Sequence, residues 1–180
     1  MLRFAAVLLC LVPSAARADS GERSAARFFS DTGNLLYLAA GVGLPLLEDG
    51  RSGGNHAART ADSVITSVLV SELLKTITHE KRPNGGNHQS FPSGHATAAF
   101  AVAAMQSHYH PGQAPFWYLG AALIGWSRVR LKDHYWHDVV AGAALGYATS
   151  WLELRQPRGF VLFPLIHRDG AVGLQFSRAF

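Results

Sequence analysis

Five stretches rich in apolar residues are separated by short segments of Gly, Pro and Asn, a pattern typical of a helical chain. The predicted helices cover residues 34–47, 62–80, 93–105, 115–126 and 133–152. Ser93 and Asp133 are suitable N-caps for the third and fifth helices, because their side-chain oxygens can accept hydrogen bonds from free backbone N–H groups. Residues 50–56 and 83–92 are predicted to be loops.

The second predicted helix is apolar around most of its circumference, through residues such as Val64, Leu69 and Ile77. A helix of this kind is expected to be buried on several sides. In the last predicted helix Gly142 and Gly146 lie four residues apart, so a neighbouring helix can approach that face closely.

The pattern changes after Pro157, where two shorter apolar runs follow. Residues 160–166 and 171–176 flank Asp169-Gly170, a dipeptide favoured in tight hairpin turns. We therefore predict a mainly α fold, a helical bundle of about five helices with a C-terminal β-hairpin at residues 160–177.

The N-terminal residues have the layout of a secretory signal. Arg3 precedes an apolar run of about nine residues, shorter than the roughly 20 of a membrane span, and Ala16-Arg17-Ala18 resembles a cleavage site. Cys10 is the only cysteine and falls inside this segment, so no disulfide is expected in the mature chain. We predict a signal peptide at residues 1–18, one domain at residues 19–180 and an extracytoplasmic location in the periplasm.

No Asp, Glu, Lys or Arg occurs between Pro83 and Ser127. Residues 108–112 divide this stretch into two apolar segments of about 14 residues, which cover about 21 Å of a hydrocarbon layer about 30 Å thick. These lengths favour a soluble or peripheral domain. Integration in the membrane, with the site facing the periplasm, is the alternative.

Composition and charge exclude several classes of protein. The 180 residues are 48% hydrophobic and 16% charged, which provides a core and argues against disorder. The net charge is +4, but without Arg3 and Arg17 the remaining 14 basic residues face 12 acidic ones. A surplus of +2 is too small for a general polyanion surface, so no nucleic-acid partner is expected.

The first of three segments that could carry chemistry runs from Lys75 to Arg82 and Pro83. Lys75 shares a helix face with the apolar residues Val64 and Val68. A lysine on a buried face needs an anion, and Arg82 follows on a non-helical backbone. The alternative is a lysine that reaches solvent beside a solvated arginine.

The second segment is Pro92-Ser93-Gly94-His95. Ser93 would cap a helix whose free N–H groups suit a phosphate, and Gly94 would let the anion approach the backbone. A bound phosphate dianion would keep His95 protonated, as a general acid requires. The alternative is an ordinary serine cap beside an exposed histidine.

The third segment contains Ser127-Arg128 followed by His134 and Asp138. Because positions 134 and 138 share a helix face, Asp138 can accept a hydrogen bond from Nδ1–H of His134 and leave Nε2 free as a nucleophile or base. Arg128 offers a planar fork for phosphate oxygens. Two alternatives are a surface His–Asp pair and a zinc site of His134, His137 and Asp138, although adjacent positions diverge by about 100° on a helix.

Together, Lys-x6-Arg-Pro, Pro-Ser-Gly-His and Ser-Arg-x5-His-x3-Asp match the signature of the type 2 phosphatidic acid phosphatase family without a departure. This family shares its fold and site with the vanadium haloperoxidases, and the resemblance covers roughly residues 60–152. It implies a metal-independent phosphatase without a cofactor. The catalytic residues would be His134 as nucleophile, Asp138 orienting it and His95 as general acid. The phosphate-binding residues implied by the resemblance are Lys75, Arg82, Ser93, Gly94 and Arg128.

The substrate class is open to more than one interpretation. The segment from Ser90 to Ala96 is more similar to the lipid-phosphate members of the family, so we expect phosphate monoesters or diphosphates of lipids or isoprenoids. Aromatic residues that could meet a membrane surface are Phe116, Trp117, Tyr118, Trp126, Trp136 and Trp151. The alternatives are a soluble periplasmic acid phosphatase, a vanadate-dependent haloperoxidase and a non-catalytic helical module.

Overall fold

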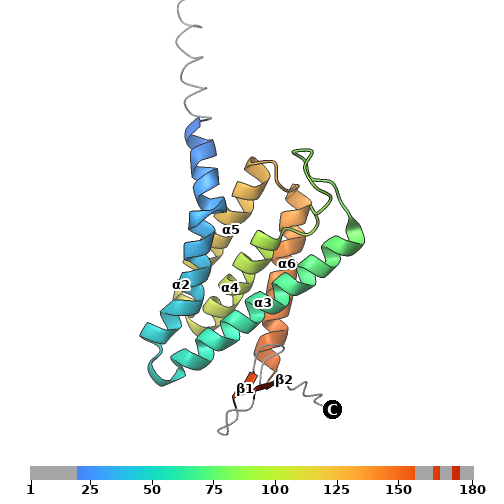
Figure 1. Cartoon of the computed structure of the whole chain (residues 1–180). Helices are drawn as coiled ribbons and strands as arrows, with labels where there is room; N and C mark the ends of the chain where they lie inside the picture. The colour runs from blue at the N-terminus through green and yellow to red at the C-terminus, as the bar shows by residue number, and fades with distance from the viewer. Residues whose placement is uncertain (1–19, 157–163, 167–171, 175–180) are drawn as a thin grey trace, which may run out of the picture.

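The computed structural model describes residues 20–156, 164–166 and 172–174. Residues 20–30 are helical. The longer elements are α2 (Thr32–Glu48), α3 (Gly53–Thr78), α4 (Gly94–Tyr109), α5 (Ala114–Arg130) and α6 (Trp136–Arg155). Short 3₁₀ turns, η1 (Gly50–Ser52) and η2 (Pro111–Gln113), precede α3 and α5. The mainly helical bundle predicted from the sequence is confirmed (Figure 1).

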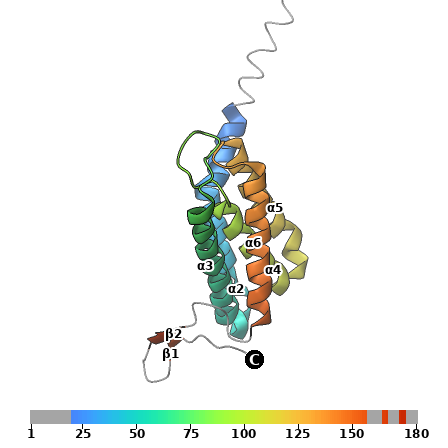
Figure 2. The same ribbon diagram turned by 90° about the vertical axis from the view of Figure 1, so that its right-hand side faces the viewer.

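Helix α4 lies at the centre of the bundle and packs against α2, α3, α5 and α6 (Figures 1 and 2). Near its N-terminal end most residues are Ala, Gly or Thr, and every residue from Ala96 to Ala99 is buried. Small side chains let several helices approach one axis. As predicted, Ser93 caps α4, because its hydroxyl accepts a hydrogen bond from the N–H of Ala96.

Helices α4 and α6 approach each other closely at two glycines of α6. A Cβ atom added to Gly142 would lie 2.6 Å from the carbonyl oxygen of Ser93, and one added to Gly146 would lie 2.8 Å from the backbone nitrogen of Ala101. Both neighbours are backbone atoms, which cannot rotate away. The predicted close helix contact at these glycines is therefore confirmed, and its partner is α4.

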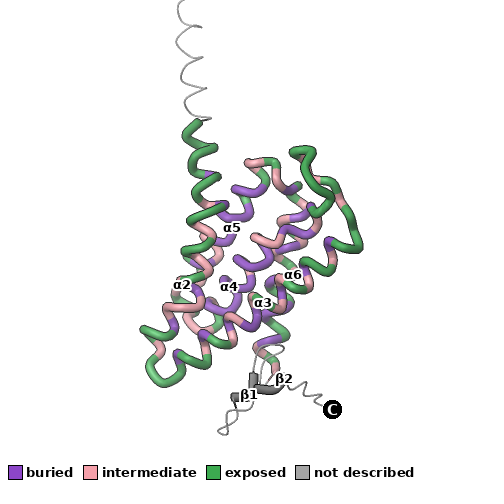
Figure 3. Tube along the Cα trace, viewed as in Figure 1, coloured by how far each residue is buried: buried purple, intermediate pink, exposed green. Residues whose placement is uncertain are grey.

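The side of α3 that meets the bundle is polar, which contradicts the predicted burial of its apolar residues. Ser63, Ser67, Ser71 and Lys75 recur every four residues and are buried. Their outward counterparts are the large apolar side chains Ile65, Leu69, Leu73 and Ile77, which are between 39% and 68% exposed. Figure 3 shows the same contrast, with a mostly buried α4 and an exposed outer side of α3. Apolar spacing identifies residues that share a face, but it does not say what that face contacts.

Polar contacts join α3 to α6 inside the bundle. Arg59 Nε donates a hydrogen bond to Glu153 Oε1 at 3.1 Å, and the hydroxyls of Ser63 and Ser150 lie 2.8 Å apart. Because Glu153 is fully buried, its pairing with Arg59 offsets part of the cost of placing a charge in the interior. These contacts fix which side of α3 faces inward.

Two predicted boundaries are wrong. Residues 50–56 are not a loop, since η1 and the first turn of α3 cover them. Asp133 does not cap the last helix, because it pairs with Arg128 instead. Tyr135 is the N-cap of α6, and its backbone N–H donates a hydrogen bond to the Asp138 carboxylate at 2.8 Å.

The predicted features at the chain ends are only partly described. Strands β1 (Pro164–Ile166) and β2 (Val172–Leu174) pair antiparallel, with Leu165 opposite Gly173. The proposed turn and the remaining residues of the predicted hairpin lie outside the described residues, so the hairpin stays a prediction. The predicted signal peptide also lies outside them.

The outer surface carries several large apolar side chains. Phe116 and Trp136 are 76% and 69% exposed, whereas Trp117 lies in the hydrophobic core with Ile124 and Val102. Trp117 is therefore not a surface aromatic. Among the described helices, none combines the length and the apolar character required to cross a membrane.

We expect Gly146→Ala to lower the free energy of unfolding by about 1–3 kcal/mol, because the new methyl group meets the α4 backbone. Gly43→Ala is the matched control, since it lies in α2 with open space around its Cβ position. Ala has the higher helix propensity, so this control should raise stability by up to about 1 kcal/mol. Thermal unfolding of both variants tests the contact, and equal midpoints would contradict it.

Candidate active site

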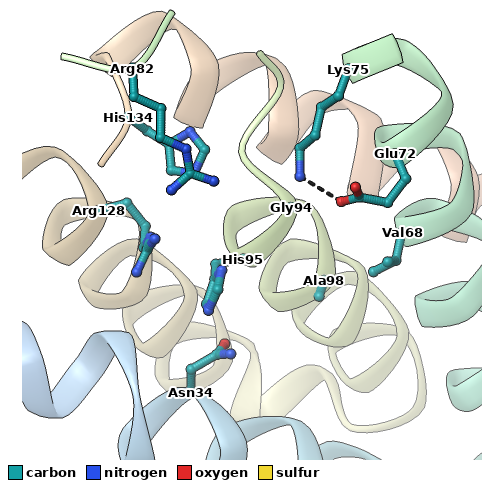
Figure 4. A pocket seen from close by; sticks show the side chains of 10 residues that line it. All are labelled: Asn34, Val68, Glu72, Lys75, Arg82, Gly94, His95, Ala98, Arg128 and His134. Carbon is teal, nitrogen blue, oxygen red and sulfur yellow. Dashed lines mark hydrogen bonds and ion pairs between the residues drawn. The ribbon is translucent and has the colours of Figure 1, made fainter. Parts of the chain in front are cut away.

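A pocket of about 300 Å³ opens where the end of α3, the start of α4, the end of α5 and the start of α6 meet (Figure 4). Six of the eight predicted site residues line it, namely Lys75, Arg82, Gly94, His95, Arg128 and His134. The other lining residues are Asn34, Val68, Glu72 and Ala98. The bundle thus brings three segments far apart in the sequence to one volume.

Three cations reach this pocket from different elements (Figure 4). Lys75 stands on the last turns of α3, Arg82 in the following loop and Arg128 at the end of α5. Lys75 and Arg128 stand near helix ends, so their long side chains can reach inward while their backbones stay helical, whereas Arg82 reaches the pocket from the loop. Like charges so close together require anionic or dipolar partners.

The protein supplies partners for two of the cations. Lys75 Nζ lies 2.5 Å from Glu72 Oε1, three residues earlier on α3. Arg128 Nη2 lies 2.9 Å from Asp133 Oδ2, and Arg128 Nη1 donates a hydrogen bond to the Ser30 hydroxyl. These contacts hold both side chains in place beside the pocket.

Two guanidinium donors remain unmatched. The Nε atoms of Arg82 and Arg128 are buried and have no hydrogen-bond partner among the described residues. A buried donor without an acceptor is destabilising, by about 1–3 kcal/mol. An oxyanion in the pocket would relieve this penalty.

His134 is buried and held in one tautomer. Its Nδ1 lies 2.7 Å from the carbonyl oxygen of Ser90, which can only accept, so Nδ1 carries the proton and Nε2 keeps its lone pair. Burial lowers the pKa of His134 to about 4, and the charge of Arg128 acts in the same direction. The imidazole is therefore neutral at pH 7, the state of a nucleophile or base.

The link between His134 and Asp138 differs from the expected direct hydrogen bond. Asp138 Oδ2 lies 3.6 Å from His134 Nδ1, while the Ser90 hydroxyl donates to the same oxygen at 2.5 Å. Ser90 thus contacts the histidine through its carbonyl and the carboxylate through its hydroxyl. Sequence reasoning missed this role because a backbone acceptor leaves no side-chain signature.

His95 faces the pocket from the first turn of α4. Burial lowers the pKa of His95 to about 4, electrostatic interactions with Arg128, His134 and Lys75 lower it further, and Asp133 opposes them. Without an anion in the pocket the ring is neutral at pH 7. Its expected protonated state therefore depends on a bound phosphate.

Two predicted residues lie behind the pocket surface. Ser93 is fully buried and uses its hydroxyl to cap α4, so it acts on the pocket by placing the helix N-terminus. Asp138 is also fully buried, at the third position of α6. The structure brings both into the same region without giving them a pocket-lining surface.

Two of the other lining residues were not anticipated from the motifs. Glu72 could have been found from its position three residues before Lys75 on one helix face. Asn34 lies on α2, outside all three motifs, and no local pattern in the sequence identifies it.

The described residues contain one group of side chains close enough to share a metal ion, and it is not the predicted one. It consists of Glu80, His137 and Asp138, with ligand atoms within 4.8 Å of one another. His134 is not part of it. The alternative zinc site of His134, His137 and Asp138 is therefore wrong in its ligand set.

The family model described as "PAP2 superfamily" matches residues 58–161. The chain belongs to the PAP2 superfamily. The matched residues include all three motifs and all eight predicted site residues, so the family resemblance drawn from the motifs is confirmed.

Several curated proteins are similar to this PAP2 superfamily member. A lipid A 1-phosphatase of Porphyromonas gingivalis is 36% identical over 90 residues, which cover 44% of this chain and 20% of that protein. Lipid phosphate phosphatase 1 of Arabidopsis thaliana is 38% identical over 137 residues, 52% of this chain and 42% of that protein. A lipid A 1-phosphatase of Rhizobium etli is 29% identical over 141 residues, 67% of this chain and 60% of that protein.

A similar fold is seen in a solved structure, that of Aquifex aeolicus LpxE. It superposes with a TM-score of 0.60 at 23% identity, over 77% of this chain and 86% of that one. This similarity supports the arrangement of the helices. The chain spans less than two thirds of the length of the curated relatives named above.

We expect the pKa of His95 to rise from about 4 to its ordinary value of about 6.5 or above when inorganic phosphate fills the pocket, because a dianion favours the charged ring. Histidine NMR titrations with and without phosphate measure this change, with His95→Gln assigning the signal. The signal of His108, exposed near the other end of α4, is the control and should not respond to phosphate. An unaltered titration of His95 would contradict the predicted phosphate contact.

Proposed function

We propose that this PAP2 superfamily member is a phosphatase that hydrolyses phosphate monoesters or diphosphates of lipids or isoprenoids. The proposal rests on one observation above all. Within the described residues, the buried Nε donors of Arg82 and Arg128 have no acceptor, and both side chains line the pocket that also holds the neutral imidazole of His134. A tetrahedral phosphoryl group would pair with these donors while the imidazole faces its phosphorus.

In the proposed reaction, His134 Nε2 attacks phosphorus in line, and the bond from phosphorus to the leaving oxygen breaks. The product is a phosphohistidine, and His95 gives its proton to the leaving oxygen. His95 then takes a proton from a water molecule whose oxygen attacks phosphorus and breaks the P–N bond. Inorganic phosphate leaves, and His134 returns to its neutral state.

Charge stabilisation in this reaction would come from the protein alone. Lys75, Arg82 and Arg128 would hold the phosphoryl oxygens, helped by the backbone at Gly94, where Ser93 places the start of α4. Phosphoryl transfer depends mainly on positioning and on stabilisation of oxygen charge, and fixed cations can supply both. Asp138, acting through Ser90, would orient His134 and stabilise its positive charge. We therefore propose a mechanism that needs no metal or cofactor.

The lipid character of the substrate is supported by the surface near the pocket. Leu73 and Ile77, on the outer side of α3, flank Lys75 in sequence and are 61% and 68% exposed. Trp136 follows His134 by two residues and is also exposed. Apolar surface of this extent marks contact with a membrane or another apolar partner. We propose that these side chains contact a membrane at the periplasmic side, where the predicted signal would direct the chain.

Phosphate release by the purified protein should not fall in EDTA and should be blocked by vanadate, which mimics the five-coordinate transition state. We expect His134→Ala to lower kcat by at least about 10⁴-fold, and Asp138→Ala to retain at least about tenfold more activity than His134→Ala. Activity lost in EDTA and restored by added metal would contradict the metal-free mechanism. An active His134→Ala protein would remove the assigned nucleophile.

The lipid preference is tested by comparing kcat/KM for a panel of lipid phosphates in vesicles with that for a soluble phosphate ester. We expect the double variant Leu73→Gln, Ile77→Gln to lose vesicle binding and activity on lipid phosphates, while its rate on the soluble ester stays the same. Thr76→Gln, a polar exchange on the exposed side of the same helix, is the control. Equal rates on all substrates would favour the soluble acid phosphatase, and absent phosphate release would favour a non-catalytic module.

A further inference from the structure

Three metal-ligating atoms converge at the start of α6, behind the pocket. His137 Nε2 lies 2.9 Å from Glu80 Oε1 and 3.1 Å from Asp138 Oδ1. Glu80 comes from the loop after α3, and the other two residues come from the first turn of α6, which lies beside that loop in Figure 1. Asp138 bends back toward the helix N-terminus to bond the N–H of Tyr135, which brings its carboxylate beside the neighbouring His137.

This cluster has more acceptors than donors. The single N–H available at His137 Nε2 can serve only one of the two carboxylate oxygens that face it. Asp138 Oδ1 is buried and accepts no hydrogen bond within the described part of the chain. A buried carboxylate oxygen without a donor is unfavourable, and a bound cation would satisfy it.

We propose that Glu80, His137 and Asp138 form a zinc site. Zinc bonds of about 2.0–2.1 Å at tetrahedral angles separate neighbouring ligand atoms by about 3.3 Å. The two distances from His137 Nε2 are close to this value, and all three ligand atoms lie within 4.8 Å of one another. An imidazole among the ligands favours zinc over magnesium or calcium. His137 is 42% exposed at its side chain, which leaves an open side where water can complete the coordination.

The ring of His137 is already oriented for this role. It stacks on Tyr135 with ring centroids 5.3 Å apart and planes 8° from parallel. Phe91 approaches from the loop before α4, with its ring centroid 6.2 Å from that of His137. Because the ring is held on these sides, binding a metal requires little reorganisation.

Zinc at this site would inhibit the proposed phosphatase, an effect that rests on the proposed function. Asp138 belongs to both places: Oδ1 faces the cluster, whereas Oδ2 accepts hydrogen bonds from Ser90 and from the Tyr135 N–H. A cation on Oδ1 withdraws negative charge from the carboxylate. The carboxylate would then stabilise positive charge on His134 less well, so the attack on phosphorus would slow.

Zinc titration of the purified full chain by calorimetry, in a buffer without phosphate, tests the site directly. We expect one tight zinc ion per chain, with binding at least about tenfold weaker in Glu80→Gln and in His137→Ala. His108→Ala, which removes an exposed histidine far from the cluster, should bind zinc like the unaltered protein. Absent zinc binding, or unchanged affinity in both ligand variants, would overturn the proposal.

Phosphate release measured at increasing zinc tests the inhibition. The unaltered protein should lose at least about tenfold in rate, and EDTA should restore it, whereas Glu80→Gln and His137→Ala should start from the same rate and resist zinc. Equal inhibition of all three proteins would overturn the inhibitory role. A protein that binds zinc but releases no phosphate would disprove the proposed function and leave the site itself supported by the binding measurement.

Discussion

The buried concentration of positive charge in one pocket is the constraint on which the rest of the structure depends. Lys75, Arg82 and Arg128 are held there at partial or complete burial, where like charges repel more strongly than in water. Glu72 and Asp133 neutralise part of this charge, and the remaining donors point to an anion as the missing component. Burial, reinforced by this positive charge, lowers the pKa of both neighbouring imidazoles and keeps them neutral. A bundle that places helix ends around one volume is a direct way to hold such a set of groups together.

The interior of the bundle achieves this with small and polar side chains. Gly142 and Gly146 let α6 lie against α4, and serines on α3 fill the space that larger residues would occupy. Large apolar side chains are displaced to the outer side of α3 as a result. The close contact of α4 with α6 and the apolar outer side of α3 therefore have the same origin. In both cases small residues occupy the inside of the bundle.

Local features of the fold and site could be predicted because they depend on neighbouring residues. The helices follow from apolar stretches interrupted by Pro and Gly, and the Ser93 cap follows from a side chain that reaches its own helix. The orientation of α3 could not be predicted. The spacing of its apolar residues shows which of them share a face, but it does not show whether that face packs against the bundle or meets solvent. Ser90 acts through a backbone carbonyl, and Glu80 meets His137 only after the loop has folded. Such contacts depend on tertiary placement, which no local pattern records.

The ion pair between Glu72 and Lys75 has a consequence for the end of a catalytic cycle. An arriving phosphoryl group must compete with a carboxylate that is already bound to the ammonium group. After the proposed hydrolysis the same carboxylate would be available to pair with the lysine again as the product departs. Glu72 would thereby weaken the hold of the pocket on inorganic phosphate and favour turnover over product inhibition.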